Sequence, residues 1–348
     1  MSDGGLFRAE HASIICRSSD DSTTMQHFSL GGIGNRMRME NMDCYEWNKK
    51  QKSWEIPEDY NKHSVRPQSR KMYGMAHDVD NNIVYVMGGE GYNRVKKYVT
   101  YNDLWRFDLI SKKWTKCPLE FPFGVYAHTM NIIKNTLYVY GGCRQSGGVM
   151  TEQQSSPYMH QIHLADFSIT NMNQQMTKGD FVPSGRQGHT SIAYNGQLWI
   201  FGGNDSNQLI KFDPILAKFE LIQSYGDVPH GRNHHSATQL DHYMYILGGD
   251  VRNHVSACSL VHQFDFDTHT WRTIIMQKTL PKLRNFSLTA YSSSTFNDYL
   301  VVFGGYKVPE NDVVSNRLEI EFNKAENHFK HQLLTNKMVS HDLLIEFS

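Results

Sequence analysis

Short apolar runs, each ended by a pair of glycines, recur along the chain. The runs are HFSL, VYVM, LYVY, LWIF, MYIL and LVVF, all rich in aromatic or β-branched residues and bounded by polar segments. Runs of this length and composition are typical of buried β-strands rather than helices. The glycine pairs stand at 31–32, 88–89, 141–142, 202–203, 248–249 and 304–305. A spacing of roughly 50 residues indicates a repeat architecture.

Four strands are predicted in each repeat. The first often begins at an Arg-x-x-His phrase, as in Arg186 to His189 and Arg232 to His235. The second is the apolar run itself, and the third ends on an acidic residue, as in NDLWRFD at 102–108. An aromatic residue is expected to open the fourth strand, at Trp54, Trp114, Phe167, Phe219, Trp271 and Phe329. Because helical periodicity is almost absent, the pattern predicts an all-β fold.

The glycine pair, the aromatic residues beside it and the later Trp together resemble the kelch repeat. The resemblance covers the chain from about residue 8 to about residue 335. It implies a six-bladed β-propeller of four-stranded antiparallel blades, because a single blade cannot bury both its faces and must stack on neighbours. We expect one domain over residues 8–348, preceded by an N-terminal tail at 1–7.

The two ends of the chain leave two ways of closing such a ring. The segment VSHDLLIEF at 339–347 has the alternation of a strand, and we expect it to return to the first unit and latch the ring. The N-terminal segment HASIICR, however, already supplies a first strand to that unit.

Composition and charge restrict the environment of the chain. Its 348 residues carry 35 Lys and Arg against 35 Asp and Glu, so no net charge draws it to nucleic acid or to anionic lipid. The five cysteines are far apart and form no CxxC pair, which argues against a zinc module and fits a reducing compartment. No apolar run is long enough to insert into a membrane, and no secretory signal is evident. We therefore expect a cytoplasmic protein.

Loops on one face of the ring hold the candidate binding residues. The segments that lead into first strands and those that follow glycine pairs open on the same side, and the first set supplies Arg70, Arg186, Arg232 and Arg284. In the kelch substrate receptors that this chain resembles, such arginines bind acidic peptide segments. The alternative is that they hydrogen-bond loop carbonyls and hold the first strands in place. Aromatic and Arg side chains are frequent in interface hot spots. The candidate binding residues therefore also include Tyr92, Arg94, Arg144, Arg252 and Tyr306.

These features predict a non-enzymatic scaffold or adaptor that binds another protein through an acidic segment. No nucleophile elbow, phosphate-binding loop or dinucleotide fingerprint is present, so we assign no catalytic residue and no cofactor. One alternative is a metal-dependent lyase. Plant specifier proteins, which are kelch propellers, carry three iron ligands at the spacing of Asp250, His254 and Cys258, although their last ligand is His. A second alternative is a structural subunit of a larger cytoskeletal or ciliary complex.

Overall fold

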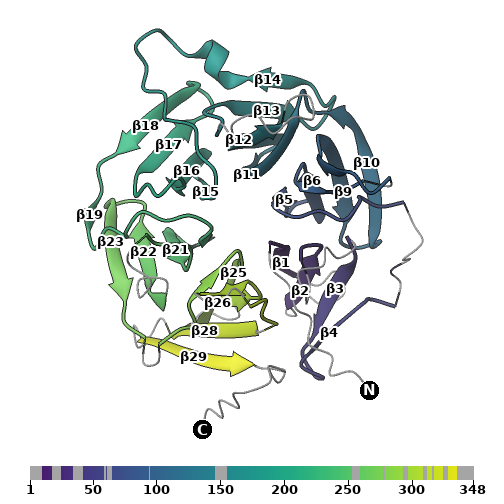
Figure 1. The fold of residues 1–348 in the computed structure, drawn as a ribbon. Coiled ribbons are helices and arrows are strands. Elements are labelled where there is room, and N and C mark those ends of the chain that lie inside the picture. The colour runs from purple at the N-terminus through teal and green to yellow at the C-terminus, as the bar shows by residue number, and fades with distance from the viewer. Residues whose placement is uncertain are drawn as a thin grey trace.

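Six four-stranded antiparallel sheets surround a central axis in the computed structural model (Figure 1). The prediction of an all-β, six-bladed propeller is confirmed. The structure describes residues 10–334 except 18–24, 34–41, 59, 61–64, 94, 146–154, 253–258, 277–278, 293–296, 309–311, 316 and 324–327. The predicted tail at 1–7 and the predicted latch at 339–347 lie outside these residues.

The blades follow one another in chain order, and in each the first strand lies nearest the axis (Figure 1). Blade 1 contains β1 (Ala12–Arg17), β2 (Met25–Leu30), β3 (Cys44–Asn48) and β4 (Ser53–Glu55). Blade 2 contains β5 (Gly74–Asp78), β6 (Ile83–Met87), β9 (Asp103–Asp108) and β10 (Lys113–Glu120). Blade 3 contains β11 (Gly124–Ile133), β12 (Thr136–Gln145), β13 (Met159–His163) and β14 (Ile169–Asn171).

The second half of the chain builds the other three blades. Blade 4 contains β15 (His189–Tyr194), β16 (Gln197–Gly202), β17 (Leu209–Asp213) and β18 (Lys218–Ile222). Blade 5 contains β20 (Ser236–Leu240), β21 (Tyr243–Leu247), β22 (Val261–Asp265) and β23 (Thr270–Ile274), and β19 (Tyr225–Gly226) adds a short parallel edge beside β23. Blade 6 contains β25 (Ser287–Ser292), β26 (Asn297–Phe303), β28 (Arg317–Asn323) and β29 (His328–Leu334).

Two short strand pairs and one 3-10 helix of the described residues lie outside the blades. The hairpin of β7 (Glu90–Tyr92) and β8 (Tyr98–Thr100) follows the second glycine pair, and β24 (Leu283–Arg284) pairs with β27 (Tyr306–Lys307). The 3-10 helix η2 (Met172–Gln175) follows β14.

Side chains from neighbouring blades form the cores between them. Met87 and Leu104 of blade 2 pack in one cluster with Leu137 and Val139 of blade 3, and the apolar second strands are buried along most of their length. Trp54, Trp114 and Trp271 are buried as the register predicts. The expectation for blade 3 is wrong in one detail. Phe167 does not open the fourth strand, because it occupies the preceding turn with a φ of 58° and β14 begins at Ile169.

The glycine pairs mark the place where each second strand meets the next blade. Both glycines of all six pairs have positive φ. A Cβ atom on Gly248 would lie 2.4 Å from the carbonyl oxygen of Leu283 in the following blade. Only glycine accepts both this backbone conformation and this close approach, so the pairs are architectural.

Blades 1 and 6 meet without a shared strand among the described residues, since each draws its four strands from its own end of the chain. Glu10 N donates to Asn285 O at 2.9 Å, and Ser13 Oγ donates to Ser287 Oγ at 2.6 Å. Farther from the axis, Phe303 packs on Trp54, with ring centroids 4.4 Å apart. Among the described residues, hydrogen bonds and aromatic packing therefore join blades 1 and 6.

Candidate functional site

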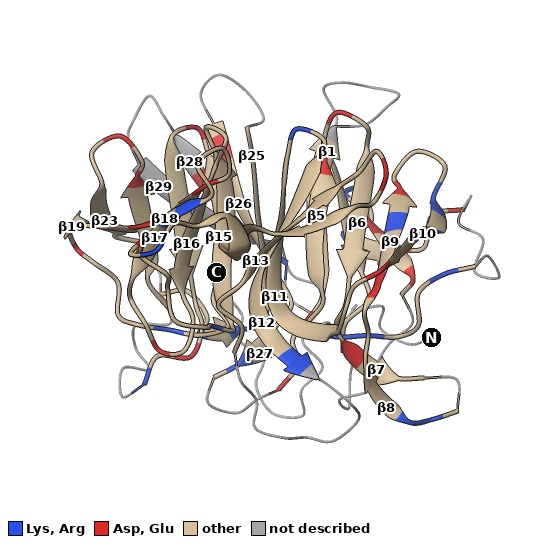
Figure 2. Cartoon of the chain, turned by 90° about the horizontal axis from the view of Figure 1, so that it is seen from above, with Lys and Arg blue, Asp and Glu red and all other residues tan. Residues whose placement is uncertain are grey.

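One face of the ring collects the irregular segments, and we call it the loop face. It is formed by the segments that lead into the first strands and by those that follow the glycine pairs, and Figure 2 shows β7, β8 and β27 on this side. The opposite face carries the tight turns within each blade, between first and second strands and between third and fourth strands. The predicted grouping of the two loop sets on one face follows from this strand order.

The predicted arginines at the strand entrances are not exposed on this face. Arg70, Arg186 and Arg232 are buried, with Arg232 at 0% exposure. The Nη1 atom of Arg186 donates to Gly202 O at 3.1 Å, and that of Arg232 donates to Gly248 O at 3.0 Å. Arg70 makes the same bond to Gly88 O at 2.9 Å. The donors of these three residues thus bind backbone carbonyls of their own blade, which agrees with the alternative that the arginines hold the first strands in place.

The backbone of these arginines extends the connection to the preceding blade. The carbonyl of Arg186 accepts from Gly142 N at 2.9 Å, and that of Arg232 accepts from Gly203 N at 2.9 Å. Arg186 and Arg232 thus each link the glycine pairs of two adjacent blades. The guanidinium of Arg70 also forms an ion pair with Asp103 at 2.6 Å. Burial alone would raise the pKa of Asp103, but the hydrogen bonds and charge of Arg70 outweigh it and lower that pKa.

Arg284 occupies a different register from the other three. In blades 2, 4 and 5, the buried arginine stands three residues before the residue that faces the axis. In blade 6, Leu283 occupies the position of this arginine. Arg284, one residue later, is half-buried on the loop face and pairs with Asp250 at 3.0 Å. Tyr306, a predicted binding residue beside it, is buried and packs with Ile33 and Val313.

Arg144 lies on the loop face of blade 3 between two aromatic rings. Its guanidinium carbon is 4.2 Å from the ring centroid of Phe123 and 4.5 Å from that of Tyr158. One donor reaches Ser156 Oγ at 3.2 Å, and no carboxylate of the described residues forms an ion pair with it. Such stacking fixes the plane of the guanidinium and leaves its other donors for a ligand.

The β7–β8 hairpin exposes several side chains on the loop face. Tyr92 is 56% exposed and packs edge-on against Tyr98, with centroids 5.1 Å apart. Val95 at the tip is 81% exposed, and Lys96 and Lys97 are exposed beside it. Arg94 lies outside the described residues. Sequence analysis missed the hairpin itself, although two tyrosines flanking an Asn-centred turn are a usable hairpin signal.

Arg252 is the remaining predicted residue on this face, in blade 5. Its side chain is 80% exposed, and its Nε atom lies 3.4 Å from Asp205 of blade 4. An exposed ion pair of this kind contributes little to stability, so the guanidinium can exchange its partner at low cost.

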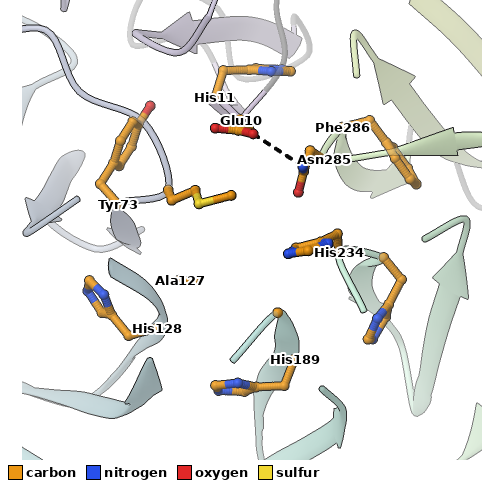
Figure 3. A pocket seen from close by; sticks show the side chains of 12 residues that line it. Glu10, His11, Tyr73, Ala127, His128, His189, His234, Asn285 and Phe286 are labelled. Carbon is orange, nitrogen blue, oxygen red and sulfur yellow. Dashed lines mark hydrogen bonds between the residues drawn. The ribbon is translucent and has the colours of Figure 1, made fainter. Parts of the chain in front are cut away.

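A pocket of about 150 Å³ lies on the axis (Figure 3). Six residues, one from each blade, line it in the left-handed backbone conformation: Glu10, Met72, Ala127, Gly188, His234 and Asn285. Their backbones form a chain of hydrogen bonds around the axis, such as His234 N to Gly188 O at 2.8 Å and Ala127 N to Met72 O at 2.8 Å. Sequence analysis missed this ring because its members share no residue type.

The next residue in each blade also lines the pocket and is often histidine. His128, His189 and His235 are buried, and burial lowers the pKa of His128 and of His189 to about 3. The Nε2 atoms of His189 and His235 lie 2.9 Å from Thr129 Oγ1 and Thr190 Oγ1 of the preceding blade. These contacts give the repeated histidines a structural role between neighbouring blades.

Of the three candidate metal ligands, Asp250 lies within the described residues. Asp250 lies 2.9 Å from His234 Nδ1 and 3.0 Å from Arg284. Burial opposes ionisation of Asp250, but these two partners outweigh it and lower its pKa. His254 and Cys258 lie outside the described residues.

A second group of potential metal ligands, His242, Asp265 and Asp267, lies at the turns of blade 5 on the opposite face. Asp265 already accepts bonds from two backbone amides of its turn. Asp108 and Asp213 cap the corresponding turns in the same way, so Asp265 has a repeated structural role.

Comparison with known proteins places these features in a family. The model described as the KLHDC2/KLHL20/DRC7 Kelch-repeats domain matches residues 21–249 and 128–327. Kelch domain-containing protein 3 of Homo sapiens is 26% identical over 250 residues, which cover 64% of this chain and 61% of that protein. Kelch repeat-containing protein 2 of Saccharomyces cerevisiae is 29% identical over 157 residues, covering 40% of this chain and 17% of that protein.

A plant protein shows the same likeness in part of its chain. Acyl-CoA-binding domain-containing protein 4 of Arabidopsis thaliana is 25% identical over 198 residues, covering 53% of this chain and 28% of that protein. The alignment thus spans less than two thirds of each of these three relatives. Within the described residues, no helix has the length and apolar character needed to cross a bilayer.

Proposed function

Because the chain belongs to the kelch-repeat family, we propose that it is a non-enzymatic scaffold that binds a segment of another protein on its loop face. A rigid propeller offers loops whose positions are set before binding, which lowers the entropy cost of complex formation. We propose that the contacts with the partner come from the accessible residues Tyr92, Arg144, Arg252 and Arg284. Arg70, Arg186, Arg232 and Tyr306 are buried and serve the fold.

The β7–β8 hairpin carries this proposal. Its strands pair with each other and contribute to none of the six blade sheets. Two tyrosines and Val95 nevertheless stand partly exposed on it, at a place where burial would be favourable. Exposed aromatic side chains beside cations are the usual composition of an interface hot spot.

The charge of the same hairpin favours an acidic partner segment. Lys96 and Lys97 are exposed, and neither forms an ion pair with a described residue. Arg144 and Arg252 add two more cations on the loop face, one without a carboxylate partner and one with an exchangeable partner. Asp or Glu side chains of a partner would complement these charges and accelerate association.

We also propose a reducing, cytoplasmic location. The four cysteines of the described residues, Cys16, Cys44, Cys117 and Cys143, are free and buried. Burial raises the pKa of the Cys16 and Cys117 thiols to about 11, which keeps them protonated and unreactive at neutral pH.

Capture of partners from the native source tests the proposal. The variant Lys96→Glu/Lys97→Glu reverses the charge of the hairpin, and Tyr92→Ala removes its exposed aromatic ring. The matched control is Lys113→Glu/Lys134→Glu, which makes the same charge change at exposed positions on the opposite face of blades 2 and 3.

We expect both hairpin variants to lose a set of proteins that the wild type and the control retain, as measured by quantitative mass spectrometry. Loss of roughly 2 kcal/mol of binding free energy for Tyr92→Ala would be typical of a hot spot. Equal recovery of every captured protein by all four forms would contradict a partner site at the hairpin.

A further inference from the structure

A second pocket, away from the loop face, lies where the two ends of the ring meet. It encloses about 190 Å³ between blade 1, which supplies Trp47, Lys49 and Lys52, and blade 6, which supplies Tyr291, Arg317 and Glu319. We call it the seam pocket. At about 30 Å³ per water molecule, this space is comparable with a small polar group and a few waters.

Arg317 is the central group of the seam pocket. Its side chain is 3% exposed, and its Nη2 atom pairs with Glu319 Oε1 at 2.6 Å. The Nε atom donates to His27 Nδ1 at 3.2 Å, whereas Nη1 is buried without a hydrogen-bond partner. A buried guanidinium donor without an acceptor is costly, and an anion within the pocket would satisfy it.

The two lysines of the pocket have the same sign of charge as Arg317. Lys49 and Lys52 are exposed at the turn between β3 and β4, and neither forms an ion pair within the described part of the chain. Three cations therefore face one carboxylate, that of Glu319. A ligand with two negative charges would balance this excess.

Aromatic rings limit the size and shape of the ligand. The guanidinium carbon of Arg317 lies 4.9 Å from the ring centroid of Trp47, which holds it in position. Tyr291 stacks on Tyr299, with centroids 4.9 Å apart, and its hydroxyl donates to Glu319 Oε1 at 3.4 Å. The walls are thus fixed by packing and hydrogen bonds, and only a compact group fits between them.

We propose that the seam pocket binds a phosphoryl group. A phosphate monoester carries close to two negative charges at neutral pH and has three acceptor oxygens, which matches Arg317 and the two lysines. The group can come from a small phosphorylated compound or from a phosphorylated side chain of a peptide. Because the ligand contacts both blade 1 and blade 6, its binding stabilises the closed ring.

Calorimetric titration and thermal unfolding of the full chain test this site. The probes are inorganic phosphate and the N-acetyl amide of phosphotyrosine, with acetate and chloride at equal ionic strength as controls. We expect phosphate to bind and to raise the melting temperature. Binding of the phosphotyrosine amide at least as tightly identifies a phosphorylated side chain as the source, and binding of phosphate alone identifies a small compound.

Variants within one turn separate the pocket from general charge effects. Lys49→Gln/Lys52→Gln should weaken phosphate binding about tenfold, because two cations near the anion are lost. Lys50→Gln, in the same turn but outside the pocket, should leave the affinity within about twofold. Because these lysines are exposed, the lysine variants should keep the fold. They therefore test the site even if Arg317→Gln unfolds the chain. Absence of phosphate binding, or equal binding by the double variant and the Lys50→Gln control, would overturn the proposal.

Discussion

At the scale of single residues, the arginines at the blade entrances act as structural connectors. Arg186 and Arg232 each donate to a glycine carbonyl of their own blade and accept from a glycine amide of the preceding blade. In blades 3 and 6 the same position is held by Val125 and Leu283, whose carbonyls make the same interblade bond. The side chain thus varies, while the backbone connection is retained around the ring.

Replacement of Arg232 by Ala should destabilise the protein rather than weaken partner binding alone. The change leaves the buried carbonyl of Gly248 without its donor and opens a cavity, and we expect a loss of about 3 kcal/mol or more in the free energy of unfolding. Urea denaturation measures this loss.

The matched control for this prediction is Arg252→Ala, whose side chain is 80% exposed and which should leave the stability nearly unchanged. Arg232→Leu, which copies Leu283 of blade 6, should cost less than Arg232→Ala because it fills the space. Equal stability of the two alanine variants would show that the buried hydrogen bonds of Arg232 contribute nothing.

At the scale of elements, the fourth strand of a blade is anchored by its opening aromatic residue. Trp271 is the second residue of β23 and is buried. Its ring packs against Phe201 of blade 4 and Phe264 of its own blade, at centroid distances of 5.1 and 4.9 Å. The β7–β8 hairpin has no such anchor: its strands belong to none of the six blade sheets, and Glu90 at its base forms a β-bridge with Lys71. The fourth strands therefore stabilise the ring, whereas the hairpin is available to bind a partner protein.

Trp271→Ala should therefore destabilise the chain by roughly 3–5 kcal/mol, as expected for truncation of a large buried side chain. Equilibrium denaturation followed by circular dichroism measures the change. Tyr92→Ala, which shortens an exposed aromatic residue of the hairpin, serves as the comparison and should leave the midpoint close to that of the wild type. A loss under about 1 kcal/mol for Trp271→Ala would contradict the interblade packing.

At the scale of the whole molecule, the buried histidines make stability depend on pH. Burial lowers the pKa of His128 and His189 to about 3, and those of His27 and His235 well below the usual value of 6.5. The unfolded chain then binds more protons than the folded chain below pH 6.5. The stability is complete above that pH and decreases as the pH falls, by roughly 1.4 kcal/mol per pH unit for each such imidazole.

His128→Phe should reduce this acid sensitivity. The residue at the same place in blade 6 is Phe286, so the blade accepts an aromatic ring there, and neither nitrogen of His128 has a hydrogen-bond partner in the described structure. Urea midpoints at pH 7.5 and pH 5 should differ less in this variant than in the wild type. The variant His163→Phe, at the exposed end of β13, is the control. An unchanged pH dependence in His128→Phe would show that this imidazole is not held neutral.

Local pattern was sufficient to predict the blades. The glycine pairs need positive φ, and the apolar runs need burial on both faces, so both are readable in a short window of sequence. The same holds for Trp54, Trp114 and Trp271, since a large aromatic residue after a turn is buried in any blade that stacks on a neighbour.

The binding residues were predicted less well because exposure depends on distant segments. Whether an entrance arginine reaches solvent is decided by a glycine carbonyl 16 or 18 residues later, and Arg186 and Arg232 are buried for that reason. In the sequence, these buried arginines have the same spacing that arginines of an exposed surface cluster would have. The one-residue offset that leaves Arg284 on the loop face becomes visible only when the blades are superposed on the axis.

What the sequence by itself determined is the number of blades, their order and the strands within them, because these follow from local conformational and burial requirements. Only the tertiary structure decided the ring of left-handed residues, whose members from Glu10 to Asn285 share no residue type and are held by hydrogen bonds between blades. It also decided the seam pocket. There Arg317 reaches Trp47 and His27, far away in the sequence, because closure of the ring brings the first and last blades together.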